Sequence, residues 1–121
     1  MTLSEFYAAV GGNYEEATAR LMNDGLIRRF VLKFRDDKSF ETLRLALTEH
    51  RTDDAFAAAH TLKGVALNLA FSRLGGSAAA LTDVLRPQNR ASFREDEADR
   101  LFAAVERDYG EVLCAIDALG T

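Results

Sequence analysis

The segment Asp53–Phe71, DDAFAAAHTLKGVALNLAF, carries more information about the fold than any other stretch of this 121-residue chain. It has no proline, few β-branched residues and many alanines and leucines, a composition that favours an α-helix. Because each residue of a helix turns by about 100°, the apolar side chains gather on one face. These side chains are Ala55, Ala59, Leu62, Ala66 and Leu69. We therefore expect an amphipathic helix, opening at residues 52–54 and reaching about Leu69, that packs this face into a helical core.

The sequence before this segment predicts four further helices. Three are short, over about residues 3–10, 14–22 and 24–36, where apolar residues recur at helical spacing. Asn13 is expected to cap the second of them, in a capping box with Glu16. Ser39 is expected to cap the fourth, which runs to about His50.

The sequence after the segment predicts two long helices. The first covers Ser72–Leu85 and stops before Pro87, because proline cannot continue the helical hydrogen-bond ladder. The second follows an expected capping box of Ser92 and Glu95 and extends almost to the C-terminus. The prediction is an all-α fold, an antiparallel up-down-up-down four-helix bundle with short additional N-terminal helices covering one end.

Length and composition place the chain among soluble single-domain proteins. We expect one domain over residues 1–121, with 48% hydrophobic and 28% charged residues. A net charge of −4 without a basic face argues against nucleic acid as a partner. The chain has no apolar run near the ~18 residues of a membrane span and no export signal at its start. Cys114 is the only cysteine, which excludes an internal disulfide, and we expect a cytoplasmic protein.

His60 is expected on the outer face of the central helix, about 140° from the centre of the apolar face. Its predicted neighbours are Phe56, Lys63, Gly64 and Leu67. A glycine in mid-helix costs about 1 kcal/mol relative to alanine. It also lets another molecule come close to the backbone, and exposed apolar side chains beside it indicate a docking surface.

These residue types match phosphoryl transfer. A neutral imidazole nitrogen is a good nucleophile near pH 7. The ammonium of Lys63, one turn away, is placed to offset the charge of a phosphoryl group on His60. The chain needs no general base if the donor already holds an activated phosphoryl group, and a carboxylate pocket with Mg²⁺ can then lie on the partner.

The run Ala59-His60-Thr61-Leu62-Lys63-Gly64, continuing into Val65–Leu69, resembles the His-x-x-Lys-Gly motif of the histidine-phosphotransfer (HPt) family. The resemblance extends from about Leu3 to Leu85 and is strongest to free-standing HPt proteins of bacterial two-component phosphorelays. It implies that His60 accepts a phosphoryl group from the aspartyl phosphate of a receiver domain and passes it to another. Lys63 would steady that group, and Gly64 would let the receiver approach.

The resemblance also implies partners and secondary site residues. The partners would be response-regulator receiver domains and a hybrid sensor histidine kinase, with Mg²⁺ on the receiver and no cofactor on this chain. Thr82 stands 22 residues after His60, where the family often has a Gln or Glu that hydrogen-bonds the imidazole or the phosphoryl group, and the Thr82 hydroxyl would take this role with a shorter reach. Arg86, one turn after Thr82, offers a second cation. Ala70 stands where many members have a helix-ending glycine. Leu67 and Phe56 are candidates for receiver docking, although Phe56 equally fits the edge of the core.

Other functions have less support. A docking module whose His60 is no longer phosphorylated is the main alternative, and retention of both Lys63 and Gly64 argues against it. An unrelated structural bundle leaves the exposed glycine unexplained. An enzyme has little support, because the sequence has neither a Gly-rich loop for ATP nor a second titratable group beside His60. We therefore expect a carrier without kinase activity. His50 is expected to act as a cation at the C-terminal end of the helix that it follows, where it eases the helix dipole. No metal site is predicted, and a monomer is the default.

Overall fold

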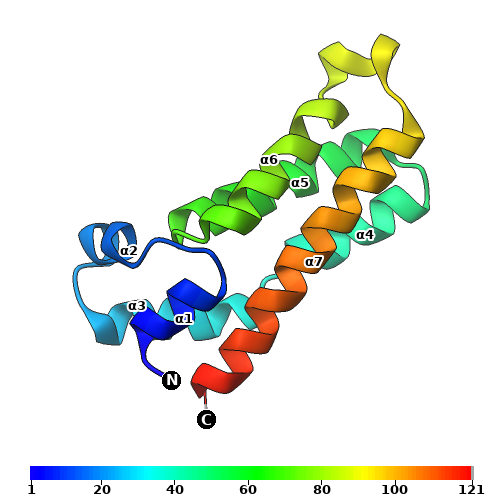
Figure 1. Cartoon of the computed structure of the whole chain (residues 1–121). Helices are drawn as coiled ribbons and strands as arrows, with labels where there is room; N and C mark the ends of the chain where they lie inside the picture. Colours follow the sequence, from blue (N-terminus) through cyan, green and yellow to red (C-terminus); the bar gives the residue numbers. More distant parts are fainter. Residues whose placement is uncertain (121) are drawn as a thin grey trace.

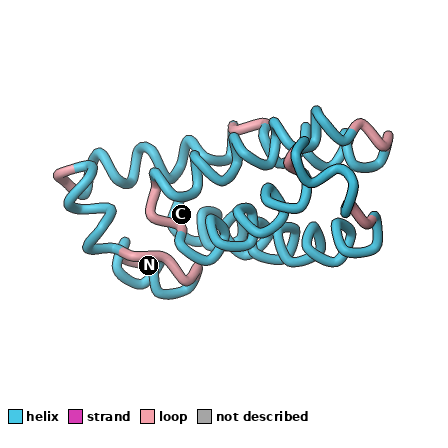
Figure 2. Tube along the Cα trace, turned by 90° about the horizontal axis from the view of Figure 1, so that it is seen from above, coloured by secondary structure: helices cyan, strands magenta, loops and turns pink. Residues whose placement is uncertain are grey.

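A computed structural model describes residues 1–120, and these residues form helices and loops without any strand (Figures 1 and 2). This confirms the all-α prediction. The α-helices are α1 (Leu3–Ala9), α2 (Tyr14–Leu21), α3 (Asp24–Lys33), α4 (Ser39–Thr48), α5 (Thr52–Asn68), α6 (Ser72–Leu85) and α7 (Glu95–Gly120). Two 3₁₀ helices, η1 (Phe34–Asp36) and η2 (Pro87–Ser92), lie after α3 and α6. Within residues 1–120 no helix combines the length and hydropathy needed to cross a bilayer.

Helices α4 to α7 form the bundle, and each runs back along the one before it (Figure 1). Helix α5 packs against both α4 and α6, and α7 packs against α6. Helix α7 therefore lies diagonally across the bundle from α5. This arrangement leaves one long side of α5 uncovered by the other bundle helices.

Aromatic rings fill the space between α4 and α7. The ring of Phe40 stacks on Tyr109 with a centroid distance of 4.1 Å and an interplanar angle of 9°. It also stacks on Phe102 at 5.5 Å and 15°. The stacked rings fill the gap between the two helices, and their burial stabilises the packing of α4 on α7.

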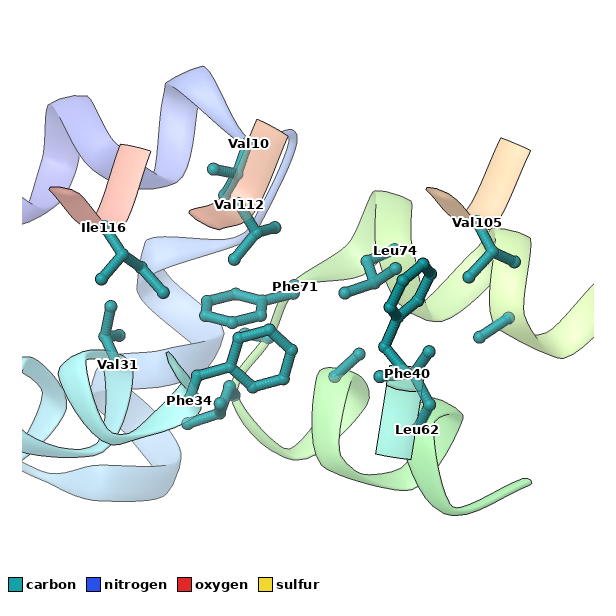
Figure 3. Close-up of a cluster of buried hydrophobic side chains, with 14 of the residues drawn as sticks. Val10, Val31, Phe34, Phe40, Leu62, Phe71, Leu74, Val105, Val112 and Ile116 are labelled. Atoms are coloured by element: carbon teal, nitrogen blue, oxygen red, sulfur yellow. The ribbon is translucent and has the colours of Figure 1, made fainter. Parts of the chain in front are cut away.

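The N-terminal helices cover the end of the bundle at which α5 turns into α6 (Figure 1). Phe71, in this turn, lies 5.8 Å from the ring of Phe6 in α1 and 5.4 Å from that of Phe34 in η1. Val112 and Ile116 of α7 close the same cluster (Figure 3). The prediction that the short helices cover one end is confirmed, and burial of large aromatic side chains is the physical reason.

The α5–α6 turn is fixed by hydrogen bonds to the N-terminal segment. The buried Tyr7 hydroxyl donates to the Leu69 carbonyl at 2.8 Å, and the Asn13 amide donates to the Ala70 carbonyl at 2.9 Å. Ala70 has φ 61°, a left-handed conformation that favours glycine. This left-handed backbone explains why many family members have a glycine at the position that Ala70 occupies here.

Helix starts were predicted less accurately than helix positions. Asn13 caps α2 as expected, since its side chain accepts from the Glu16 amide at 2.9 Å. The second half of the expected capping box is wrong, because the Asn13 amide donates to the Ala70 carbonyl and the Glu16 carboxylate pairs with Arg20. Ser39 is not a cap: it is the first residue of α4, and the Asp37 carboxylate accepts from its amide at 2.8 Å. The loop before α4 thus supplies the capping carboxylate from two residues upstream.

The expected capping box of Ser92 and Glu95 is wrong. The Ser92 hydroxyl donates to the Asn89 carbonyl at 3.1 Å inside η2, and α7 begins only at Glu95. Because the 3₁₀ helix continues through Ser92, this serine is too far upstream to cap α7. The connection between α6 and α7 is therefore mostly this 3₁₀ helix, Pro87–Ser92.

Candidate functional site

Helix α5 has two different long faces, and the inner one forms as predicted. Leu62, Ala59 and Ala66 are completely buried between α4 and α6. Ala55 is also buried, and so is Leu69 just beyond the helix end. Packing of this face fixes the rotation of α5, so the side chains opposite it must point away from the core.

His60 lies on the outer face and is exposed. Its imidazole makes no hydrogen bond or ion pair with the part of the chain that the structure describes. The ring of Phe56, one turn earlier, stacks on it with a centroid distance of 6.0 Å and an interplanar angle of 20°. The imidazole nitrogens therefore remain accessible to another molecule, while one ring face is in contact with an aromatic side chain.

Lys63 and Gly64 lie about one turn after His60 on the same helix. Lys63 is half-buried, and its ammonium forms no ion pair within residues 1–120. A Cβ added at Gly64 would meet no heavy atom within 4 Å. Gly64 is therefore not needed for helix packing, and its effect is an open patch of helix backbone beside an uncompensated positive charge.

Leu67 completes the outer face two turns after His60. Its side chain is 41% exposed, an unusual fraction for a leucine on a bundle helix. It lies over Gly75 of α6, where an added Cβ would clash with the leucine side chain. Its carbonyl also accepts a hydrogen bond from the guanidinium of Arg20 in α2. Because Gly75 has no side chain, the Leu67 side chain packs close to the backbone of α6.

Thr82 does not belong to this surface, which corrects the expectation that its hydroxyl contacts the phosphoryl group. The side chain is fully buried, and the hydroxyl donates to the Ala78 carbonyl at 2.7 Å. Thr82 follows Leu81 and precedes Leu85 on the inward face of α6. A hydroxyl in this position satisfies its hydrogen bond within its own helix.

Arg86 does reach the outer face of α5, from the end of α6. Its guanidinium carbon lies 5.7 Å from the ring centroid of Phe56, a cation–π distance. Its Nε donates to the Asp83 carboxylate at 3.1 Å. The sequence suggested a cation here, but the contact with Phe56 joins two helices and was not predictable from either one alone.

The second histidine, His50, pairs with the start of α7. His50 pairs through Nδ1 with the Glu95 carboxylate at the start of α7 and has φ 57°. Within residues 1–120 no three His, Cys, Asp or Glu side chains are grouped in a way that would hold a metal ion. The prediction placed His50 at the C-terminal end of the preceding helix, α4, whereas its side chain pairs with a carboxylate at the start of α7.

The sequence of the region that contains α4 to α6 matches a known family. A family model of the Hpt domain matches residues 26–115. This chain belongs to the Hpt domain family. No curated protein and no solved structure matches it. The match includes all of α5 and most of α7 but not α1 or α2, whereas the resemblance noted from the sequence began near Leu3 and ended near Leu85.

Membership of the Hpt family sets the class of function. Hpt domains are phosphocarrier modules of two-component signalling that have no kinase activity of their own and interact with receiver domains and kinases. In this Hpt domain the outer face of α5, defined by Phe56, His60, Lys63, Gly64 and Leu67, is the candidate site. We refer to these five residues as the outer face below.

Proposed function

We propose that this Hpt domain carries a phosphoryl group on His60 between receiver domains of a phosphorelay. The observation that supports it best is the geometry around His60: an exposed imidazole, an unpaired ammonium one turn away and open backbone at Gly64. A stable bundle requires none of these three features. Together they meet the needs of nucleophilic attack on a phosphoryl group held by a partner.

The transfer step needs no group on this chain other than the imidazole. The unprotonated ring nitrogen of His60 attacks phosphorus, an N–P bond forms, and the P–O bond to the aspartyl carboxylate of the receiver breaks. The carboxylate leaves as an anion, and the other ring nitrogen keeps its proton. Lys63 offsets the charge of the phosphoryl group after transfer. Delivery to the next receiver is the same step in reverse.

The partner would supply the remaining chemistry. Mg²⁺ and the carboxylates that hold it would lie on the receiver, which is charged in turn by a hybrid sensor histidine kinase. The exposed Leu67 offers an apolar contact for the receiver, and the open backbone at Gly64 lets it come close. We propose a monomer in the cytoplasm, because a monomer leaves the outer face free for exchange of partners.

The test is phosphate transfer from phosphorylated receiver domains to the wild type, to His60→Gln and to His50→Gln. We expect acid-labile, base-stable label on the wild type and on His50→Gln, and none on His60→Gln. His50→Gln is the matched control, since it removes the other exposed histidine. If several competent receivers leave the folded wild type unlabelled, the carrier function is wrong and a non-phosphorylated docking module remains.

A further inference from the structure

Arg86, Phe56 and His60 form a continuous series of side-chain contacts from the end of α6 to the middle of α5. The centroid of the Phe56 ring lies 6.0 Å from the centroid of the imidazole. It lies 5.7 Å from Cζ of the Arg86 guanidinium. Arg86 is therefore one aromatic ring away from the atom that would carry the phosphoryl group. Its present anionic partner, Asp83, lies on its own helix three residues earlier.

The ion pair of Arg86 with Asp83 is easily exchanged. The Asp83 side chain is 67% exposed and that of Arg86 is 32% exposed, with a single Nε–Oδ1 distance of 3.1 Å. Exposed pairs of this kind contribute little to stability, because water screens the two charges. A phosphoryl group carries about −1.5 to −2 charges near pH 7 and has three acceptor oxygens, so it competes well with one carboxylate.

The backbone around Arg86 is fixed, so that only the side chain has to move. The Asn89 amide donates to the Arg86 carbonyl at 2.9 Å, and the Asn89 side chain donates to the Asp83 carbonyl at 2.7 Å. These bonds hold the junction of α6 and η2. The Phe56 ring is in contact with both the imidazole and the guanidinium, so the guanidinium has only to pass the edge of this ring to reach a phosphoryl group on His60.

We propose that phosphorylation of His60 draws the Arg86 guanidinium from Asp83 to the phosphoryl group, with Phe56 as the positioning residue that keeps the guanidinium and the imidazole together. This inference rests on the proposed phosphorylation of His60 and adds a second cation, from another helix, to Lys63. The Thr82 hydroxyl is buried and donates to the Ala78 carbonyl, so it is not available to the phosphoryl group, whereas Arg86 just after α6 is.

The test uses chemical phosphorylation, so that it does not depend on a partner. All variants are made in a His50→Gln background, which leaves His60 as the only histidine, and are phosphorylated with potassium phosphoramidate. The pH midpoint of the phosphoryl ³¹P resonance reports nearby cations, because a cation favours the dianion. We expect Arg86→Gln to raise this midpoint by about half a pH unit and Arg86→Lys to restore part of the difference.

Two further variants separate the proposal from a general charge effect. Arg35→Gln removes a similar exposed cation, paired with Asp117 at 3.2 Å at the other end of the bundle, and should leave the midpoint unchanged. Phe56→Leu keeps every charge, and should raise the midpoint in the same direction as Arg86→Gln but by less. In the wild type the Arg86 Nε–H resonance should shift on phosphorylation.

The outcomes distinguish this inference from the proposed function. Equal midpoints for the His50→Gln parent and for Arg86→Gln in that background, or an Arg86 Nε–H resonance that does not move, would overturn the exchange and leave the carrier function intact. A His60 that takes no phosphoryl group from either phosphoramidate or receivers would overturn both.

Discussion

The two faces of α5 differ in what their residues do for the fold. Leu62 and Leu67 are the same residue type on the same helix, yet Leu62 is fully buried and Leu67 is 41% exposed. The inner face is what packing alone would favour. The outer face carries a glycine with open space around it and a lysine with no ion-pair partner in residues 1–120, neither of which stabilises a bundle. The difference teaches that function is to be sought where a helix departs from its best packing and propensity.

The largest expected difference between the two faces is in stability. Leu62→Ala should lower the free energy of unfolding by about 3 kcal/mol, because it leaves a cavity between α4, α5 and α6. Leu67→Ala should lower it by less than about 1 kcal/mol, because much of that side chain already contacts water. Urea denaturation of both variants measures the two values. Equal losses would mean that the outer leucine is a core residue.

The end of the inner face depends on one buried hydrogen bond. Tyr7→Phe removes the donor to the Leu69 carbonyl and should lower the free energy of unfolding by about 1–2 kcal/mol. Burial also raises the pKa of Tyr7 above its ordinary value of 10.0. The neutral phenol is thus favoured in the folded state, so its contribution is present below pH 10 and is lost as the pH rises further.

The alkaline dependence supplies the control for Tyr7. The wild type should lose stability above pH 10, as followed by thermal unfolding, and Tyr7→Phe should lose less over the same range. Equal slopes for the two proteins would show that ionisation of Tyr7 does not contribute to alkaline unfolding.

On the outer face, a substitution at Gly64 should raise the free energy of unfolding rather than lower it. Gly64→Ala should raise the free energy of unfolding by about 1 kcal/mol, since alanine is the better helix former and the added methyl group meets nothing. The same change should slow phosphate transfer from a receiver. Gly110→Ala on α7 is the matched control, because that glycine is also helical and unobstructed. It should gain similar stability with unchanged transfer, and slowed transfer there would refute a local role for Gly64.

The smallest effect is expected at the turn that ends the inner face. Ala70→Gly relieves the left-handed strain of about 1–2 kcal/mol but adds freedom to the unfolded chain and removes a buried methyl group. These effects nearly cancel, so unfolding should change by less than about 1 kcal/mol. Ala66→Gly has no strain to relieve and should destabilise by about 2 kcal/mol. Denaturant unfolding of the pair checks this, and similar losses would argue against strain at Ala70.

Local periodicity was sufficient to predict most of the fold. The bounds of α5 and α6 and the outward direction of His60 follow from apolar spacing, because an amphipathic helix has one way to face its core. The capping residues were harder, since Ser39 and Ser92 have the right chemistry but their roles depend on the preceding loop. Short polar side chains form several kinds of local hydrogen bond, and the sequence does not select among them.

The parts of the site that the sequence missed are those made by two helices. Counting 22 residues from His60 led to Thr82, but the apolar pattern of α6, with Leu81 and Leu85 beside it, already indicated an inward position. The contact of Arg86 with Phe56 depends on how far α6 extends along α5, which no single-helix pattern contains. Tertiary placement decides which cation reaches the outer face.

The diagonal position of α7 has a practical consequence for optical measurements. Cys114, the only cysteine of the chain, is exposed on α7, and α7 packs on α6 rather than on α5. A maleimide dye attached there would sit at one defined point, away from the face on which a receiver would dock. Fluorescence anisotropy or energy transfer from that dye would follow complex formation in real time without engineering a new attachment point.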